Sequence, residues 1–317
     1  SWLGSMWIRR FLVHNNVFDI PGERSSHSHP VPRGGGIPIV LTTLVGWGIL
    51  LQMGLEHTQE VAVISGMVLL IMLVSWFDDV GNISAGKRLT VHCACVTVAV
   101  ILLPLRPVDI PYLPILLETL LTAFLWLYFI NIFNFMDGID GLSGVETVSI
   151  CLGIAVTAGF LGTTSDFSCL AIIIAASATG FLAWNWQPAK LFLGDVGSIP
   201  LGFLLGWLLI ELAAEGHWPA ALILPSYYFA DATLTLLYRS MKMEPVWRGH
   251  REHFYQRAVA GKLTHSQASR AVGVTNIWLI CCALVSTIMI PVGLLGAGLG
   301  VCILLSYFQL AAQQIRA

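Results

Sequence analysis

Residues 61–79 read VAVISGMVLLIMLVSWFDD, an apolar run of seventeen residues followed directly by the carboxylates of Asp78 and Asp79. A helix needs about 20 mostly apolar residues to cross the hydrocarbon core of a bilayer, so this run predicts a membrane span with two acids at its end. Carboxylates close to hydrocarbon are costly and usually mark function. The stretch therefore indicates a membrane protein that handles a metal and phosphates at the membrane surface.

The composition of the whole chain agrees with this prediction. Its 317 residues are 56% hydrophobic and 11% charged, whereas a soluble domain has roughly 25% charged residues. The net charge of -2 says little about partners, because the position of each charge along a membrane chain matters more than the sum. The cysteines all lie in apolar runs without the spacing of zinc ligands, so we interpret them as small packing residues.

Further apolar runs predict the other spans. Ten are long enough: 36–55, 61–77, 89–104, 112–133, 142–161, 168–186, 196–214, 218–237, 272–290 and 292–312. Residues 1–11 resemble half of an eleventh, and since Ser1 is not a natural start we expect further residues before it. Arg9 and Arg10 follow this apolar stretch, which is the reverse of the order in a signal peptide. We predict one all-α domain over 1–317, a polytopic membrane protein with about 10–11 transmembrane helices.

Threading the chain through these spans places its polar segments on one side: 14–35, 78–88, 134–141, 187–195, 238–271 and the C-terminus. Fifteen of the sixteen Lys and Arg residues fall on that side or at helix ends facing it, and Arg106 is the exception. The positive-inside rule makes this side cytoplasmic. A transporter would be expected to carry polar groups at the midplane, often in matching repeats, and the sequence shows neither. One cytoplasmic face is predicted to carry the chemistry.

The first predicted loop contains three consecutive glycines at 34–36. Glycine lets the backbone come close to a ligand, and Arg24 and Arg33 nearby would attract an anionic one. A turn-rich connector explains the same composition, so the sequence leaves both interpretations open.

The acidic pair at 78–79 is followed by Lys87. Adjacent carboxylates cannot share one helical face, so at most one of Asp78 and Asp79 is expected to point at a given metal or proton while the other orients partners. A solvated helix end is the alternative. Lys87 is a point charge suited to phosphate, although a lysine that snorkels to the interface is equally common.

Polar side chains with acceptor groups recur at every third residue around the end of the fourth predicted span: Asn131, Asn134, Asp137 and Asp140. On an unbroken helix they would drift slowly round one side, but Gly138 and Gly141 are expected to end the helix here. The helix end then presents amides and carboxylates that suit sugar hydroxyls, a nucleobase or hydrated Mg²⁺. Helix capping by a lone aspartate is the alternative.

The sequence FLGDVGS at 192–198 combines a tight turn with an acid. Gly194 and Gly197 permit a turn that offers backbone N–H groups to anionic oxygens, and Mg²⁺ prefers one or two carboxylates with substrate phosphates completing its octahedron. Asp195 is therefore the favoured metal ligand, with an N-terminal helix cap as its competing role. Asp231 lies inside a span and needs a partner or neutralisation, which fits structural hydrogen bonding and support of the site equally.

The longest polar segment is the predicted cytoplasmic loop 239–271, with seven Lys or Arg, two Glu and three His residues. Such loops usually satisfy the positive-inside rule or touch anionic lipid. His250 and His253 have a spacing that could bind zinc, but no third ligand lies close by, so we favour contact of His253 and Arg257 with a diphosphate. The residues THSQ at 264–267 match a capping box that opens the next helix.

Together these motifs resemble those of the polyprenyl-phosphate N-acetylhexosamine-1-phosphate transferases, glycosyltransferase family 4, which include phospho-MurNAc-pentapeptide translocase. The likeness runs from Asp19 to about Val259, and the acidic pair, NFMDGIDGL at 134–142 and FLGDVGS at 192–198 look like the three acidic signatures of the family. The resemblance implies roles for individual residues: Asp195 as ligand of Mg²⁺, or of Mn²⁺ in its place; Asp78 and Asp79 as the essential catalytic pair; Lys87 as a substrate-side lysine; and Asn134, Asp137, Asp140 and Asn185 as the nucleotide and sugar-phosphate pocket.

One departure from the family pattern concerns the last cytoplasmic loop. Members usually carry a histidine cluster there, but this chain keeps His253 and has Tyr255 and Gln256 beside it. The departure argues against a MurNAc-pentapeptide substrate. It resembles the O-antigen-initiating branch, whose UDP-sugars are N-acetyl-6-deoxyhexoses or UDP-GlcNAc.

The resemblance implies transfer of a sugar-1-phosphate from a UDP-N-acetylhexosamine to undecaprenyl phosphate with release of UMP, at the cytoplasmic face of a bacterial inner membrane. Membrane lipid is then a partner, nucleic acid is not, and a homodimer is left open. A phosphate monoester has its second pKa near about 6 and phosphoryl transfer asks mainly for positioning and charge neutralisation. We therefore favour direct attack, with Asp78 and Asp79 aligning metal and phosphate, over a strong general base or a covalent aspartyl intermediate.

Two other function classes fit the hydropathy. An ion-coupled transporter of lipid-linked sugars predicts flux without UMP release, and a non-catalytic scaffold predicts that carboxylate substitutions leave function intact. Neither explains three acidic motifs on one face.

Overall fold

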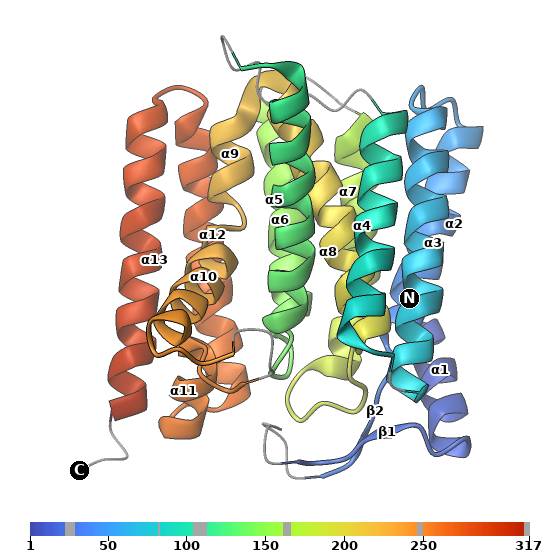
Figure 1. Ribbon diagram of the computed structural model, residues 1–317, viewed down its shortest axis with the longest axis vertical. Coiled ribbons are helices and arrows are strands. Elements are labelled where there is room, and N and C mark those ends of the chain that lie inside the picture. Colours follow the sequence, from blue (N-terminus) through green and yellow to red (C-terminus); the bar gives the residue numbers. More distant parts are fainter. Residues whose placement is uncertain (23–28, 82, 104–112, 161–165, 246–249, 314–317) are drawn as a thin grey trace.

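The computed structural model describes residues 1–22, 29–81, 83–103, 113–160, 166–245 and 250–313. Long apolar helices dominate it (Figure 1), which confirms the predicted all-α membrane class. Seven single helices are long and apolar enough to cross a membrane: α3 (Thr58–Gly81), α4 (Ala85–Leu102), α5 (Ile115–Phe135), α6 (Leu142–Phe160), α7 (Asp166–Asn185), α12 (His265–Ser286) and α13 (Ile290–Gln313). The eighth such stretch, Asp195–Ile223, combines α8 (Asp195–Leu212), a π-helical turn (Ala213–His217) and α9 (Trp218–Ile223).

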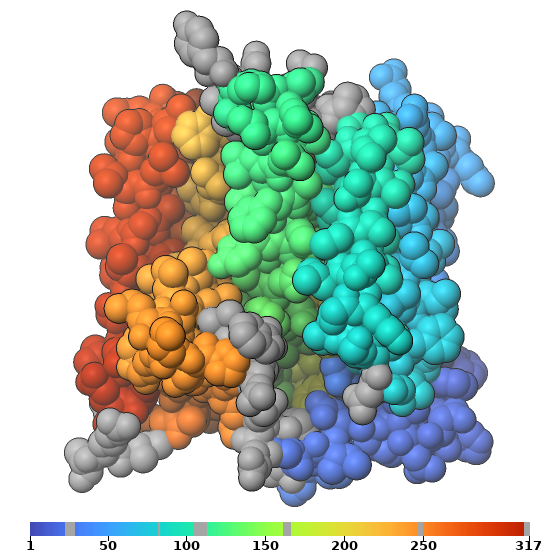
Figure 2. Space-filling view, viewed as in Figure 1, coloured from blue at the N-terminus to red at the C-terminus, as the bar shows by residue number. Residues whose placement is uncertain are grey.

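The shorter elements complete the described chain. They are α1 (Trp2–His14), strands β1 (Phe18–Asp19) and β2 (Val31–Pro32), the apolar α2 (Gly36–Gln52), α10 (Ser226–Met241) and α11 (Phe254–Gly261). The two strands are antiparallel, with Phe18 opposite Pro32 and Asp19 opposite Val31. Large apolar side chains on the outside of α5 are exposed, among them Leu116 (65%) and Phe124 (63%), and Figure 2 shows this outer surface in green. Such a surface suits hydrocarbon surroundings.

The predicted span 218–237 is wrong as a single helix. The chain leaves the helical path at Pro225, and α10 then follows a different direction from α9 (Figure 1). Proline has no backbone N–H to continue the helical hydrogen bonds, which explains the break. The consequence is a separate, shorter helix, α10, of 16 residues beside α5, at the end of the molecule that carries the polar loops.

The predicted capping box is confirmed at the start of α12. The Gln267 backbone N–H donates to the Thr264 hydroxyl (3.2 Å), and the Thr264 N–H donates to the Gln267 side chain (2.8 Å). This reciprocal pair satisfies two donors of the first turn. Helix α12 therefore begins at His265, earlier than the apolar run from residue 272 suggested.

Helix α8 lies at the centre of the bundle, and nearly all of its residues are buried. Small residues let α5 come close to it: an added Cβ at Gly202 would lie 3.0 Å from the Ile130 Cα. The Trp126 indole N–H donates to the Phe203 carbonyl (2.9 Å), which joins the two helices directly. Close approach through small residues is how membrane helices gain contact when lipid is as apolar as their side chains.

The described parts of the polar segments that were predicted to share one side do so. In Figure 1 the lower end holds α1, the β1–β2 pair, α11 and the α3–α4, α5–α6 and α7–α8 connections. Which side of the membrane this end faces stays a prediction. The exceptional Arg106, and Arg24 of the first loop, lie outside the described residues.

The glycine triplet at 34–36 brings the first loop against the 192–197 segment. Gly34 and Gly35 donate backbone hydrogen bonds to the Phe192 carbonyl (3.2 and 2.8 Å), and Gly36 donates to the Leu193 carbonyl (2.9 Å). A Cβ at Gly36 would lie 2.0 Å from the Gly197 Cα. The glycines thus serve contact between two backbones, and this contact holds the N-terminal ends of α2 and α8 together.

This crossing predicts that Gly36→Ala is strongly destabilising. No Cβ fits 2.0 Å from backbone, so α2 and α8 must move apart at a typical overpacking cost of about 1–3 kcal/mol. Thermal unfolding in detergent measures the change. The matched control is Gly48→Ala in the same helix, where no heavy atom lies within 4 Å; it should leave the melting temperature unchanged or raise it. Equal melting temperatures for the two variants would contradict the close crossing.

Candidate functional site

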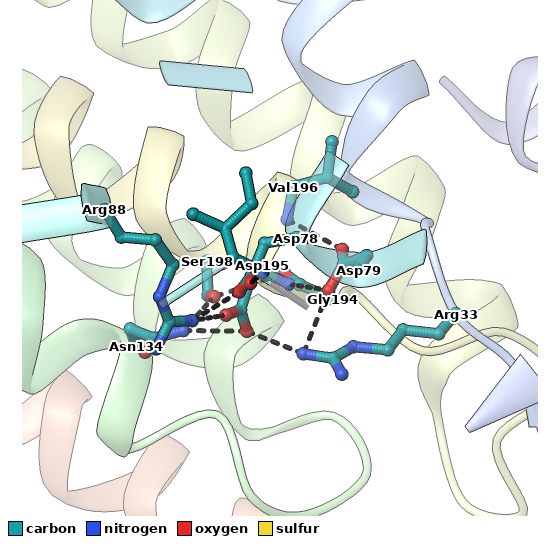
Figure 3. Close-up of polar contacts among 10 residues, drawn as sticks. Arg33, Asp78, Asp79, Arg88, Asn134, Gly194, Asp195, Val196 and Ser198 are labelled. Carbon is teal, nitrogen blue, oxygen red and sulfur yellow. Dashed lines mark hydrogen bonds and ion pairs between the residues drawn. The ribbon is translucent and has the colours of Figure 1, made fainter. Parts of the chain in front are cut away.

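Asp195 is the centre of a cluster of charged side chains at the polar end of the bundle (Figure 3). It is the first residue of α8, and Gly194 before it has a φ of 75°, a conformation that glycine adopts at no steric cost. Arg33 donates to one carboxylate oxygen of Asp195 and Arg88 donates to the other, each at 2.6 Å. The Asn134 amide lies 3.2 Å from the first of these oxygens. Two cations therefore neutralise one carboxylate that is 14% exposed.

Asp79 holds the start of α8 in place. Its buried carboxylate accepts hydrogen bonds from the backbone N–H groups of Asp195 (3.2 Å) and Val196 (3.0 Å), and lies 3.0 Å from the Arg33 guanidinium. A carboxylate at free N–H groups of a helix start is favourable for both hydrogen bonding and the helix dipole. Asp79 thus fixes the position of Asp195.

Asp78 contacts the other cation. Its carboxylate accepts from the Ile83 backbone N–H (2.7 Å) and from the Arg88 guanidinium (2.5 Å). The two adjacent acids therefore join one network through different arginines, Asp78 through Arg88 and Asp79 through Arg33.

Arg88 was not assigned a role from the sequence, and the structure places it in the cluster. Lys87, which the resemblance suggested, is exposed and makes no hydrogen bond or ion pair within the described residues. Neighbouring residues on a helix point about 100° apart, so only one of the two can face inward. One sequence feature could have identified Arg88. His92 and Val96, four and eight residues further along, belong to the buried face of α4, and this spacing places Arg88 on the same face.

A polar cavity of about 200 Å³ lies beside the cluster. Its lining includes five residues that the sequence singled out, Asn134, Asp137, Asp140, Asn185 and Asp195, together with others that include Arg33, Phe192, Gln256 and His265. The cavity is therefore built from the first loop, the α5–α6 and α7–α8 connections, and the starts of α11 and α12.

Asp137 lies in the cavity wall and accepts a hydrogen bond from the Ser143 hydroxyl (2.7 Å). Its surroundings raise the pKa of this carboxyl from an ordinary 3.8 to about 7, chiefly through burial, while Ser143 and the charge of Arg33 act in the opposite direction. A carboxyl with this pKa is a donor in part of the molecules and an acceptor in the others at neutral pH.

Asp140 and Asn185 join segments of the wall. One Asp140 oxygen accepts from the Ala189 backbone N–H (3.0 Å) and the other lies 3.1 Å from the His265 ring nitrogen Nδ1. The Asn185 side chain accepts from Gly141 N–H (2.9 Å) and donates to the Leu191 carbonyl (3.0 Å). Both predicted pocket residues border the cavity, but each already has partners within the protein.

His253 and Arg257, predicted to contact a diphosphate, do not line the cavity in the described part of the chain. His253 is buried and its Nδ1 lies 3.2 Å from Asp231. The Asp231 carboxylate also accepts from the backbone N–H groups of Phe254 (3.0 Å) and Tyr255 (3.3 Å) at the start of α11, which favours the structural role for this buried acid. Arg257 stacks over the Phe254 ring at 4.5 Å.

An apolar groove of about 490 Å³ runs over α4, α5 and α10. Its lining is mostly apolar and includes Leu89, Phe124 and Phe135. Asn131 lies in this groove, with its amide donating to the Leu127 carbonyl (2.7 Å). One turn further along α5, Asn134 lines the polar cavity, and Leu89 directly follows Arg88. The groove and the charged cluster are therefore about one helical turn apart on α5.

The cluster offers hard oxygen ligands for a metal ion. Among the described residues, no group of three or more His, Cys, Asp or Glu side chains could hold a metal alone. Mg²⁺ commonly takes one or two carboxylates and completes its octahedron with water and substrate phosphates. Asp195, aided by Asp78 or Asp79, fits that donor set. It lines the cavity, and its two carboxylate oxygens are paired with the guanidinium groups of Arg33 and Arg88.

The model of the family described as "Glycosyl transferase family 4" matches residues 61–213. A probable undecaprenyl-phosphate N-acetylglucosaminyl 1-phosphate transferase of Bacillus subtilis is 25% identical over 269 residues, 81% of this chain and 74% of that protein. The phospho-N-acetylmuramoyl-pentapeptide-transferase of Chlamydia trachomatis is 30% identical over 243 residues, 66% of this chain and 70% of that protein.

A third relative is the decaprenyl-phosphate N-acetylglucosaminephosphotransferase of Mycolicibacterium smegmatis, 26% identical over 235 residues, 65% of this chain. The chain spans 56% of the length of that protein. The matched family region contains Asp78, Asp79, Asp137 and Asp195. It also contains Arg88 and Asn134, so most of the charged cluster falls within it.

The raised pKa of Asp137 predicts a pH-dependent difference in stability. The folded chain keeps this proton up to about pH 7 and the unfolded chain only up to about pH 4, so folding loses stability as the pH rises through this window. Asp137→Asn has no proton to lose, so its melting temperature should rise relative to the unmodified protein between these values and the gap should stay constant above them.

Thermal unfolding in detergent over this pH range measures the gap. Ser143→Ala removes a hydrogen bond that lowers the pKa, so it should extend the window to higher pH. A gap that is equal at about pH 5 and about pH 7 would contradict a protonated Asp137 in the folded state.

Proposed function

Because this chain belongs to the polyprenyl-phosphate hexosamine-1-phosphate transferase family, we propose that it transfers an N-acetylhexosamine-1-phosphate from a UDP-sugar to undecaprenyl phosphate and releases UMP. The observation that carries the proposal is the position of the charged cluster. Three carboxylates and two arginines border a polar cavity, and an apolar groove lies about one helical turn away on α5. The transporter alternative has no support, since the relatives compared are transferases.

The apolar groove suits the lipid acceptor. A polyprenyl chain can lie on α4, α5 and α10, where the lining is apolar, and burying each CH₂ group contributes about 0.8 kcal/mol. Because Asn131 in the groove and Asn134 at Asp195 are one turn apart on α5, a phosphate at the end of that chain would lie close to the cluster and its two arginines. Arginine binds phosphate with two parallel hydrogen bonds.

The polar cavity suits the donor. Arg33 lines it and is paired with Asp79 and Asp195, so an incoming diphosphate meets a cation in the cavity wall. Asn134, Asp137 and Gln256 offer amide and carboxyl groups further along the wall. Such groups match hydroxyl and amide partners of a nucleotide sugar.

The geometry favours direct attack by the lipid phosphate on the sugar-bearing phosphorus. One anhydride then replaces another, and UMP leaves with the electron pair of the broken P–O bond. The Asp78 carboxylate is held by Arg88 and the Ile83 N–H, which suits orientation of the cationic side chain better than removal of a proton. A phosphate monoester is mostly ionised at neutral pH, with its second pKa near about 6, so little base catalysis is needed.

Mg²⁺, or Mn²⁺ in its place, would be held by Asp195 and would supply charge neutralisation for the phosphates. Arg33 and Arg88 must then turn from carboxylate to phosphate oxygens. Asn134 helps to keep Asp195 in place through its 3.2 Å contact and its 2.8 Å hydrogen bond to the Ser198 hydroxyl.

We further propose a UDP-linked N-acetyl-6-deoxyhexose or UDP-GlcNAc as the donor, as in O-antigen initiation. Of the two residues that depart from the family pattern, Gln256 lines the cavity, whereas Tyr255 is buried with its hydroxyl donating to the Phe135 carbonyl (3.4 Å). Gln256 is thus the selective residue in this proposal. The distribution of basic residues supports a site that faces the cytoplasm, and the bacterial sources of the relatives support a bacterial inner membrane in this proposal.

The proposed function is tested by incubating purified protein with a panel of UDP-sugars, undecaprenyl phosphate and Mg²⁺. We expect UMP and a lipid-linked diphosphate sugar to form in equal amounts, and only when the lipid is present. Absence of UMP with every donor, or UMP formed without lipid, would contradict the proposed transfer.

The metal assignment predicts that Asp195→Asn loses most of the transfer activity, by about 10²–10³-fold, which is typical when one electrostatic group of a site is removed. The matched control is Asp166→Asn, because Asp166 also opens an apolar helix but at the opposite end of the bundle (Figure 1). This control should keep near-normal activity. Mg²⁺-dependent turnover by the Asp195 variant at the normal rate would overturn the assignment.

The orientation of α4 predicts that substitutions at two neighbouring residues affect kcat to very different extents. Arg88→Gln should lower kcat by about 10²-fold, since the guanidinium that joins Asp78 and Asp195 is lost. Lys87→Gln should change kcat little, because Lys87 is exposed outside the cluster. Steady-state UMP release measures kcat for both variants. A larger loss of kcat in Lys87→Gln than in Arg88→Gln would contradict the orientation of α4 described above.

A further inference from the structure

We propose that His265 contacts the nucleoside half of the donor, and that Asp140 is a positioning residue that acts through this imidazole. The inference rests on the proposed transferase function. His265 was noted in the sequence only as part of a capping box, yet it lines the polar cavity.

His265 is held in place by its own contact with Asp140 and by two hydrogen bonds of nearby residues on α12. The Asp140 carboxylate lies 3.1 Å from its Nδ1, and the next residue, Ser266, donates its backbone N–H to the Gln187 side chain (2.7 Å). One turn further along α12, the Ser269 hydroxyl donates to the Asp140 carbonyl (2.8 Å). The imidazole therefore sits at a junction of α12 with the α5–α6 and α7–α8 connections, where preorganised side chains bind ligands with little loss of freedom.

The contacts of His265 leave one ring nitrogen for a ligand. Both contacts involve Nδ1: the carboxylate at 3.1 Å and the Asp140 backbone N–H at 3.3 Å. Because Nδ1 accepts the Asp140 backbone N–H, the neutral ring carries its proton on Nε2, which is then a donor. Nε2 makes no hydrogen bond within the described residues, and the residue is 8% exposed at the cavity.

The Asp140 carboxylate is less suited to bind a ligand directly. One oxygen faces His265 and the other accepts from the Ala189 N–H (3.0 Å). The backbone N–H of Asp140 donates to Nδ1 and so fixes both the tautomer and the orientation of the ring. Asp140 therefore prepares His265 as a donor, and its carboxylate, held by the Ala189 N–H, keeps this backbone N–H in position.

The direction of phosphoryl transfer decides which half of the donor reaches His265. The attacking and leaving oxygens lie roughly in line on opposite sides of the phosphorus. The lipid phosphate comes from the groove over α4, α5 and α10, and these helices face the viewer in Figure 1 with α12 behind them. The leaving UMP therefore extends toward the wall with His265, where the Phe192 side chain and the Asn185 amide also line the cavity.

A donor nitrogen on this wall suits a hydrogen-bond acceptor of uridine. The O4 carbonyl of uracil and the ribose hydroxyl oxygens are such acceptors, and cytosine has an amino donor in place of O4. Calorimetry measures the binding of UMP, CMP and 2′-deoxyuridine monophosphate to the whole protein. Comparison of the three nucleotides distinguishes a contact to uracil from a contact to ribose.

We expect His265→Ala to weaken UMP binding by about tenfold, the effect of one lost hydrogen bond, and to raise KM for the UDP-sugar more than it lowers kcat. The preference for UMP over CMP should shrink if the contact is to uracil, and that over the deoxy nucleotide if it is to ribose. The control is Thr264→Ala, which removes the cap of α12 and keeps the imidazole; both preferences should persist.

The positioning role of Asp140 is tested with a double mutant. Asp140→Asn should weaken UMP binding on its own and add nothing in the His265→Ala background. Additive losses would overturn the positioning role, and unchanged nucleotide preferences in His265→Ala would overturn the nucleoside contact. If the unmodified protein also released no UMP from any UDP-sugar, the proposed function itself would fail.

Discussion

The site depends on the cost of keeping ionised carboxylates beside hydrocarbon. A charge removed from water needs a partner of opposite charge and hydrogen bonds to its remaining lone pairs. The buried Asp79 meets both needs with Arg33 and with the first N–H groups of α8, while Asp195 is bridged by Arg33 and Arg88. Loss of either guanidinium would leave an acid unpaired, so the first loop, α3, α4 and α8 are tied to one another by charge. The close crossing of Gly36 and Gly197 brings the first loop near enough for this pairing.

The same cluster lies close to two hollows of different polarity. The groove over α4, α5 and α10 is apolar, and the cavity behind it is polar. A reaction between a lipid phosphate and a water-soluble nucleotide sugar needs such an arrangement, because each substrate stays in its own surroundings and only the phosphates meet. Helix α5 contributes to both compartments from one face, with Asn131 in the groove and Asn134 in the cavity. The break at Pro225 gives α10 the short, separate course that lets it form the far wall of the groove.

Much of this arrangement could be predicted from the sequence, because apolar runs and acidic motifs reflect local chemistry. The long spans, the helix end after Phe135 and the cap at Thr264 follow from residues close together in the chain. What could not be predicted depends on distant contacts. The orientation of α4 decides between Lys87 and Arg88, and it follows from packing on neighbouring helices. His265 reaches the cavity only because α12 lies beside the α5–α6 connection, and His253 is withdrawn because Asp231 needs the start of α11.

The central claim is that Asp195 and the donor diphosphate share one divalent cation at the head of the groove. Electron paramagnetic resonance of bound Mn²⁺ tests it directly, because coupling to phosphorus reports phosphate in the first coordination sphere. The account predicts phosphorus coupling when Mn²⁺ and a UDP-sugar are both present, and its loss in Asp195→Asn with retention in Asp166→Asn. Equal Mn²⁺ affinity and equal phosphorus coupling in the two variants would contradict it.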